Sequence, residues 1–278
     1  MIIFKKQKEL KKYLTKLNNS LIGFVPTMGA LHQGHISLIK RSKKSCNITI
    51  CSIYVNPTQF NNTDDLLKYP RTMKDDIKIL QENKCDILYC PEDNDLYKVN
   101  EKCIEYRFNG IELYLEGKYR PSHFNGVATV VEKLLNIVKP QMAFFGEKDL
   151  QQLMIIKELV KQNNISTRVI GCPIIREKNG LAKSSRNQHL SKTDRESCGI
   201  IYKQLLLFNN LFKKTDLEVL KKQIITNITS NKKIEIEYLE LVNLDTFQIE
   251  NDIKNNMNYA CCIAVSISGV RLIDNIIL

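Results

Sequence analysis

The stretch that decides the fold is GFVPTMGALHQGH, residues 23–35. It begins in a short apolar run, Leu21–Val25, which ends at Pro26, and it passes through two glycines to two histidines three residues apart. A strand, a glycine-containing turn and a helix start together form a phosphate cradle, because free N–H groups meet the positive end of the helix dipole there. We therefore predict a strand, a loop with an anion site, and a helix from His35 to Lys44.

Similar units fill the chain up to about residue 174. Further strands are predicted at Ile48–Val55, Asp86–Tyr89, Met142–Phe145 and Arg168–Gly171, and further helices at Thr72–Glu82, at Val127–Val138 and from Leu150 to Val160. Such alternation predicts an α/β fold, a Rossmann-like parallel sheet with helices on both faces. Ligands of such sheets bind outside the carboxyl ends of the strands, so the loops after Val25, Val55 and Phe145 are where a site is expected.

The pattern changes in the last hundred residues. Ser191-x-x-Asp194 predicts a capped start for a helix that runs through Leu205–Phe212, and Asp216–Ile228 a second helix. Two apolar strands, Ile234–Val242 and Tyr259–Ser268, follow. We expect two domains: residues 1–174, which bind nucleotide and substrate, and residues 175–278, a smaller α+β lid.

Composition excludes several classes of protein. Of 278 residues, 43% are hydrophobic, which is too many for a disordered chain, and no apolar run reaches the ~20 residues that cross a bilayer. The first residues lack the apolar core of a signal peptide, so we expect a cytoplasmic protein with no membrane partner. The net charge of +11 comes from scattered lysines without Trp, which favours anionic small substrates over a nucleic acid partner.

The nine cysteines form no C-x-x-C pair, and the four histidines do not complete a zinc site. Seven of them fall in or beside apolar runs, where a reduced thiol behaves as a small hydrophobe: Cys46, Cys51, Cys85, Cys90, Cys172, Cys261 and Cys262. We predict buried free thiols, with disulfides or metal ligation as the alternative, and no metal ligands of the protein's own.

Four polar segments supply candidate chemistry. His32 and His35 offer imidazole donors to a developing negative charge, although both could be ordinary loop histidines. Asn56–Phe60 offers amides for a hydroxyl or carboxylate, and Lys148 in Gly146–Asp149 suits phosphate; a plain turn and a solvated helix start are the alternatives. A mobile loop, Ser184–Asn187, could close over a triphosphate, whose oxygens Arg grips in a bidentate manner.

These residues resemble the pantoate–β-alanine ligase family of the nucleotidylyltransferase superfamily, whose members carry HIGH-type motifs. The resemblance runs from about Gly23 to Ser191 through VPTMGALHQGH, VNPTQF, YPRT, RPSHFNGVATVV, FGEKDLQQL and GLAKSSRN. The last ninety residues match only in pattern. Two positions depart from the family: Lys183 replaces an apolar residue, often Met, and Ser122 replaces the usual glycine of R-P-G-H-F.

The resemblance implies a homodimeric enzyme that joins (R)-pantoate to β-alanine with ATP and Mg²⁺, through a pantoyl adenylate, and releases AMP and diphosphate. It assigns His35 as the catalytic proton donor and Gln59 and Gln152 to substrate, Gln59 touching both pantoate and β-alanine. Asn56, Asp76, Arg120 and His123 match the surroundings of the family's active site. The resemblance assigns ATP binding to Met28, Gly29, Ala30, Leu31, His32, Gln33, Gly34, His35, Gly146, Glu147, Lys148, Asp149, Ile175, Lys183, Ser184, Ser185 and Arg186.

Two other classes share some of these features. A different adenylyl or cytidylyl transferase would have the H-x-G-H loop, but the paired loops at Gln59 and Gln152 argue against it. A tRNA-binding protein of the synthetase kind is favoured only by the charge, since no tRNA-reading domain fits the last ninety residues.

Overall fold

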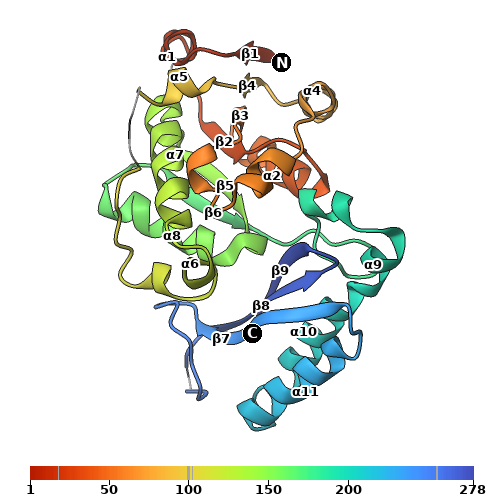
Figure 1. Ribbon diagram of the computed structural model, residues 1–278. Helices are drawn as coiled ribbons and strands as arrows, with labels where there is room; N and C mark the ends of the chain where they lie inside the picture. The colour runs from red at the N-terminus through yellow and green to blue at the C-terminus, as the bar shows by residue number, and fades with distance from the viewer. Residues whose placement is uncertain (18, 99–100, 102, 255) are drawn as a thin grey trace.

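The computed structural model describes residues 1–17, 19–98, 101, 103–254 and 256–278, which form two sheets with flanking helices (Figure 1). Six parallel strands make the larger sheet, in the order β1-β4-β3-β2-β5-β6. They are β1 (Ile2–Phe4), β2 (Ile22–Thr27), β3 (Ile48–Ile53), β4 (Ile87–Tyr89), β5 (Met142–Gly146) and β6 (Arg168–Cys172). The smaller sheet is antiparallel and consists of β7 (Ile234–Asn243), β8 (Tyr259–Ile267) and β9 (Val270–Ile277).

Helices and 3₁₀ turns connect these strands. The helices are α1 (Gln7–Leu14), α2 (Gln33–Ser45), α3 (Thr63–Lys68), α4 (Met73–Glu82), α5 (Asp93–Leu96), α6 (Leu115–Tyr119), α7 (His123–Val138), α8 (Leu150–Gln162), α9 (Lys192–Ser197), α10 (Gly199–Leu211) and α11 (Leu217–Thr229). The 3₁₀ turns are η1 (Pro57–Gln59), η2 (Ile111–Leu113), η3 (Glu147–Asp149) and η4 (Ser185–His189). None of the helices within the described ranges is long and apolar enough to cross a membrane.

Both faces of the parallel sheet are covered, as predicted. Successive side chains of a strand point to opposite faces, so neighbours in the sequence join different cores. Phe24 and Ile50 pack in the core with α7 and α8, whereas Val25 and Cys51 pack in the core with α2 and α4. The continuous apolar runs of the first half follow from this double burial.

The strand order reverses between β2 and β5. From β2 the chain moves outward to β3 and β4, and it then returns to place β5 on the other side of β2. In open parallel sheets this reversal leaves a crevice at the carboxyl ends of the two strands. The loops that follow β2 and β5 therefore face each other across that crevice.

The small sheet lies beside this end of the molecule, and β9 is its strand nearest the six-stranded sheet (Figure 1). One face of the small sheet packs with the core of the six-stranded part. The opposite face packs with α10 and α11 in a separate core that contains Leu205, Ile224 and Ile263. The predicted domain boundary after residue 174 falls two residues beyond β6 and stays a prediction.

Two local predictions were wrong, and two strands were missed. The strand predicted to end at Pro26 runs on to Thr27, because β5 pairs with β2 only at Gly23 and Phe24 and leaves no ladder bond for proline to break. The helix predicted from Ser191 through Phe212 is two helices, α9 and α10, separated at Cys198. The strands β1 and β9 were missed, since β1 is short and β9 interrupts its apolar residues with Arg271, Asp274 and Asn275.

The cysteine prediction is confirmed for the described residues. All nine are free thiols, and only Cys46 among the seven predicted to be buried is half-buried instead. Burial raises the pKa of Cys172 to about 11, so this thiol is unreactive at neutral pH.

Candidate active site

The two histidines of the opening stretch form the start of α2. His32 is its N-cap residue, and its Nδ1 accepts a hydrogen bond from the backbone N–H of Gly34 at 3.1 Å. His35 Nδ1 accepts one in return from the backbone N–H of His32 at 3.3 Å. Of the two residues between them, the second has to be glycine, because a Cβ at position 34 would lie 2.7 Å from Cε1 of His32. The H-x-G-H spacing is thus a capping arrangement that fixes both rings.

This arrangement also fixes the protonation of both rings. With Nδ1 accepting in each ring, the neutral imidazole carries its proton on Nε2. Burial, and then repulsion from His35 when that ring is protonated and from Lys148, lower the pKa of His32 to about 3, while burial and Lys148 lower the pKa of His35 to about 4. Both rings are therefore neutral at pH 7, and each turns a single Nε2–H donor away from the loop.

Asp76 holds the loop that precedes these histidines. Its buried carboxylate accepts hydrogen bonds from the backbone N–H groups of Ala30 at 3.0 Å and Leu31 at 2.7 Å. Ser185 reaches the same loop from η4, where its hydroxyl donates to the carbonyl of Ala30 at 3.1 Å. The loop after β2 is thus fastened both to α4 and to the segment that was predicted to close over a triphosphate.

The second predicted loop carries Gln59 against the start of α7. A Cβ at Gly126 would lie 2.3 Å from the carbonyl oxygen of Thr58, so only glycine lets this helix approach so closely. Asn56 donates to the Gln59 side-chain oxygen at 3.2 Å, and the Gln59 amide nitrogen lies 3.0 Å from Sδ of Met28. Gln59 therefore faces the histidine loop across the crevice.

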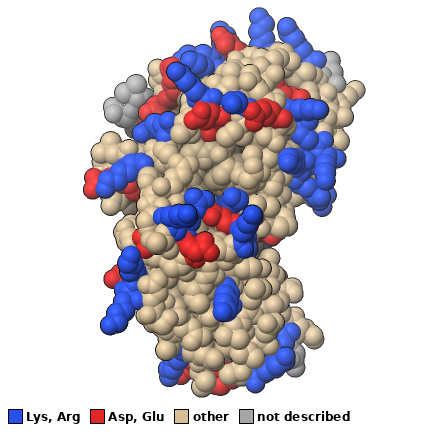
Figure 2. All heavy atoms as spheres, turned by 90° about the vertical axis from the view of Figure 1, so that its right-hand side faces the viewer, with Lys and Arg blue, Asp and Glu red and all other residues tan. Residues whose placement is uncertain are grey.

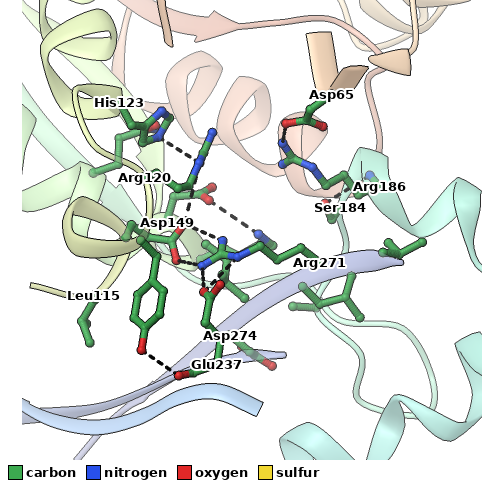
Figure 3. A pocket seen from close by; sticks show the side chains of 18 of the residues that line it. Asp65, Leu115, Arg120, His123, Asp149, Ser184, Arg186, Glu237, Arg271 and Asp274 are labelled. Carbon is green, nitrogen blue, oxygen red and sulfur yellow. Dashed lines mark hydrogen bonds and ion pairs between the residues drawn. The ribbon is translucent and has the colours of Figure 1, made fainter. Parts of the chain in front are cut away.

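His123 and Arg120 support Gln59 from behind. His123 Nδ1 donates to the backbone carbonyl oxygen of Gln59 at 2.7 Å. Its Nε2 accepts from Arg120 at 3.1 Å, a contact that Figure 3 shows. Burial, and then the charge of Arg120, lower the pKa of His123 to about 4, so that the ring is neutral. Ser122, just before α7, has a φ of 64°, which explains why the family usually has glycine there.

The loop after β5 and the 3₁₀ turn η4 supply the positive charges. Lys148 Nζ lies 3.5 Å from Oδ1 of Asp149. The Lys148 charge is close enough to both histidines to lower the pKa of each. Arg186 pairs with Asp65 of α3 at 2.9 Å across the opening of the site (Figure 3). On the surface, positive and negative side chains are mixed around the middle of the molecule, where its two parts meet (Figure 2).

These residues surround two adjoining cavities of about 230 and 680 Å³. Many of the predicted positions line the smaller one: Met28, His32, Gly34, His35, Gln59, Gly146, Lys148, Asp149, Gln152, Ile175, Lys183, Ser184, Ser185 and Arg186. The larger cavity continues toward β9 and shares Arg120, His123 and Gln152 with the smaller one. The fold thus gathers at one place segments that lie far apart in the sequence.

The remaining predicted positions do not line the smaller cavity. They are Gly29, Ala30, Leu31, Gln33 and Glu147. Ala30 and Leu31 are buried behind the histidines, and Gln33 is exposed. These residues shape the loop, and whether any of them touches a ligand stays a prediction.

Three residues that line the larger cavity, Glu116, Arg271 and Asn275, were not predicted from the sequence. The available signal was the polar set Arg271, Asp274 and Asn275 within an otherwise apolar C-terminal stretch. Among the residues that the structure describes, no cluster of three or more His, Cys, Asp or Glu side chains could hold a metal ion.

Comparison with known proteins assigns the chain to a family. Residues 2–277 match the model of the family described as pantoate-beta-alanine ligase. Pantothenate synthetases of Flavobacterium psychrophilum and of Azobacteroides pseudotrichonymphae are 44% and 46% identical, each over 99% of both chains. The crystal structure of pantothenate synthetase from Thermus thermophilus has a TM-score of 0.91 at 32% identity, with 99% of each chain covered.

A solved relative contains ligands. The pantoate-beta-alanine ligase of Francisella tularensis, in a structure described as complexed with beta-gamma ATP and beta-alanine, is 40% identical with a TM-score of 0.82. That alignment covers all of this chain and 97% of the relative. From the family match and these full-length similarities, we conclude that the chain belongs to the pantoate–β-alanine ligase family.

Proposed function

We propose that the protein condenses (R)-pantoate with β-alanine at the expense of ATP, and releases pantothenate, AMP and diphosphate. Membership of the ligase family supports the reaction, and the ligands of the Francisella relative support ATP and β-alanine as substrates. The observation that carries the proposal is the pair of neutral histidines at the start of α2, facing the Gln59 loop across one cavity.

The first step is attack of a pantoate carboxylate oxygen on the α-phosphorus of ATP, with diphosphate as the leaving group. Negative charge grows on the phosphate oxygens during this step, and donors fixed in advance stabilise it most effectively. Nε2–H of His32 and His35, the Lys148 ammonium and the Arg186 guanidinium are such donors at this cavity. The neutral state of His35 indicates that it donates a hydrogen bond and keeps its proton.

The second step is attack of the β-alanine amine on the carbonyl carbon of the adenylate, with AMP as the leaving group. Gln59 and Gln152 both line this cavity and offer amides to the hydroxyl and carboxylate groups of the two substrates. A closed pocket keeps water from the adenylate, and the contact of Ser185 with Ala30 already brings η4 over the histidine loop.

Mg²⁺ fits this site as a companion of ATP. Mg²⁺ takes oxygen ligands and keeps several waters, and in nucleotide sites it uses one or two carboxylates together with phosphate oxygens. Asp149, which lines both cavities, is the carboxylate beside Lys148 and the histidines. The ion would neutralise phosphate charge, while the donor groups of the chain orient the α-phosphate.

Isotope transfer tests the reaction path. Pantoate labelled with ¹⁸O in its carboxylate should give ¹⁸O in AMP, read by mass spectrometry, because one oxygen stays on the α-phosphorus when the amine displaces AMP. Transfer of the γ-phosphoryl group would instead give ADP and label in inorganic phosphate. That outcome would refute the adenylate path.

We also propose that the enzyme is a cytoplasmic homodimer, as the family resemblance implies. Light scattering of the purified protein tests the dimer, which predicts twice the 32.2 kDa mass of one chain. Cell fractionation tests the location.

A further inference from the structure

Strand β9 contacts the site at two places through two side chains on one of its faces. One place is α6, which leads to the Gln59 loop, and the other is the η3 turn that carries Lys148. Arg271 and Asn275 lie four residues apart and so point to the same side of the strand. Ile273 between them packs partly against the core of the six-stranded part, which identifies the side they face. Each of the two polar side chains ends on a different loop of the site.

Arg271 binds Glu116, a buried carboxylate at the start of α6. The pair is bidentate, with N–O distances of 2.7 and 2.6 Å, and the Tyr238 hydroxyl donates to the same carboxylate at 2.8 Å. Burial disfavours the charge on Glu116, but its bonds to Arg271 outweigh this effect and the pKa of Glu116 is lowered. Gln151 holds the backbone of Glu116, accepting from its N–H at 2.9 Å.

From Glu116 a short chain of contacts leads to the substrate loop. Arg120 lies 3.7 Å from the Glu116 carboxylate and donates to His123, which in turn donates to the carbonyl of Gln59. Arg120 is largely buried and lines both cavities, so it needs a fixed anion to hold its guanidinium in one place. Glu116 supplies this anion, and Arg271 and Tyr238 hold its carboxylate in place.

Asn275 contacts the η3 turn on the ATP side of the proposed site. Its amide nitrogen donates to the carbonyl oxygens of Glu147 at 2.8 Å and Lys148 at 3.0 Å. These carbonyls belong to η3, the turn that carries the Lys148 ammonium toward the histidines. The contact is made by a neutral side chain and is separate from the ion pairs of Arg271.

We infer that β9 is a positioning strand with two independent arms: Arg271 and Glu116 orient Arg120, His123 and Gln59 for the carboxylate substrates, and Asn275 orients the Lys148 turn for the phosphates of ATP. The inference depends on the proposed function. It assigns roles to Glu116, Arg271 and Asn275 as positioning residues, since none of the three needs to touch a substrate.

Steady-state kinetics on the full-length protein tests the two arms against each other. AMP release is measured while pantoate and ATP are varied in turn with the other substrates saturating. Glu116→Gln should raise KM for pantoate at least about tenfold and leave KM for ATP within about twofold. Asn275→Ala should do the reverse, and Glu116→Asp, which keeps the charge, should restore part of the pantoate affinity.

The matched control is Glu240→Gln, which breaks an ion pair with Lys221 inside the C-terminal part at 2.6 Å. It should leave both KM values unchanged. If Glu116→Gln and Asn275→Ala shift both KM values in the same proportion, or shift neither, β9 only holds the two parts together and the inference is wrong. If Glu116→Gln fails to fold, Asn275→Ala, which removes no charge, is sufficient as a test. The inference then requires that this variant raises KM for ATP and leaves KM for pantoate within about twofold.

The unsubstituted enzyme separates this result from the proposed function. If it forms no AMP from ATP, pantoate and β-alanine, the proposed function fails and the inference fails with it. If it forms AMP while the variants show no split, only the inference is overturned.

Discussion

Replacing His35 by alanine should remove most of the activity while leaving the fold intact. The ring contributes one Nε2–H donor to the cavity, because its Nδ1 is occupied by the backbone N–H of His32. Loss of one such donor costs about 2.7–4 kcal/mol of transition-state stabilisation, which is on the order of 10²–10³ in rate. We expect kcat for AMP formation to fall by that factor.

The cost in stability should be much smaller. The substitution removes a single 3.3 Å hydrogen bond within the capping arrangement of α2, while the bond from Gly34 to His32 remains. A bond of this kind contributes about 0.5–1.5 kcal/mol. Urea denaturation should therefore show a folded variant with a slightly lower midpoint.

A glutamine at position 35 distinguishes hydrogen bonding from proton transfer. Its amide N–H donates a hydrogen bond but does not exchange a proton as an acid does. Because burial and Lys148 keep His35 neutral, with a pKa of about 4, we expect His35→Gln to be at least about tenfold faster than His35→Ala. Glu240→Gln, which breaks an ion pair with Lys221 at 2.6 Å and lines neither cavity, serves as the control and should be fully active.

The assay is AMP release with all three substrates saturating, read by a coupled enzyme. Near-normal turnover of His35→Ala would show that the histidine is not part of the catalytic machinery. Equal, strongly reduced rates for the alanine and glutamine variants, with the unsubstituted enzyme losing activity above a single pKa, would show that His35 transfers a proton and that the neutral-donor reasoning is wrong.

Four further predictions follow from single features of the structure. Gln152→Ala should weaken binding of pantoate more than that of ATP in isothermal titration, because this uncharged amide lines the cavity together with Gln59; an unchanged pantoate affinity would contradict this. Lys183→Met should raise KM for ATP, more at low than at high salt, since the Lys183 charge lies near enough to lower the pKa of His32 and exposed charges are screened by salt; identical kinetics at both ionic strengths would mean that Lys183 is a solvated loop residue. Ser122→Gly should stabilise the protein by roughly 0.5–1 kcal/mol in urea denaturation, because release of about 1–2 kcal/mol of left-handed strain exceeds the added entropy of an unfolded glycine; a destabilised variant would show that the Ser122 side chain contributes a contact of its own. His35 and His123 have folded pKa values of about 4, below the unfolded 6.5, so the unfolded state takes up protons first and stability falls as pH drops below 6.5, by roughly 2 kcal/mol for each group at pH 5; a free energy of unfolding that stays constant from pH 7 to 5 would contradict this.

The sequence alone determined the parts of this protein that depend on neighbours along the chain. The apolar runs and the turn after them located the parallel strands at Ile22–Thr27, Ile48–Ile53 and Met142–Gly146 to within a few residues. Because all parallel strands end at the same edge, the loops after them could be assigned to one site before any contact was known. The H-x-G-H spacing predicted a phosphate cradle, which stays a prediction, and the resemblance to a ligase family predicted the reaction.

Only the tertiary structure decided the protonation states and the hydrogen-bond partners of the side chains at the site. The neutral state of His35 depends on burial and on Lys148, which lies more than one hundred residues away in the sequence. The pairing of Glu116 with Arg271 spans 155 residues, and that of Asn275 with Glu147 spans 128. Periodicity and turn chemistry report on contacts a few residues apart, whereas a pKa or an ion pair depends on whatever the fold brings within a few ångströms. The contacts of β9 were therefore beyond local pattern, because they join residues more than one hundred positions apart in the sequence.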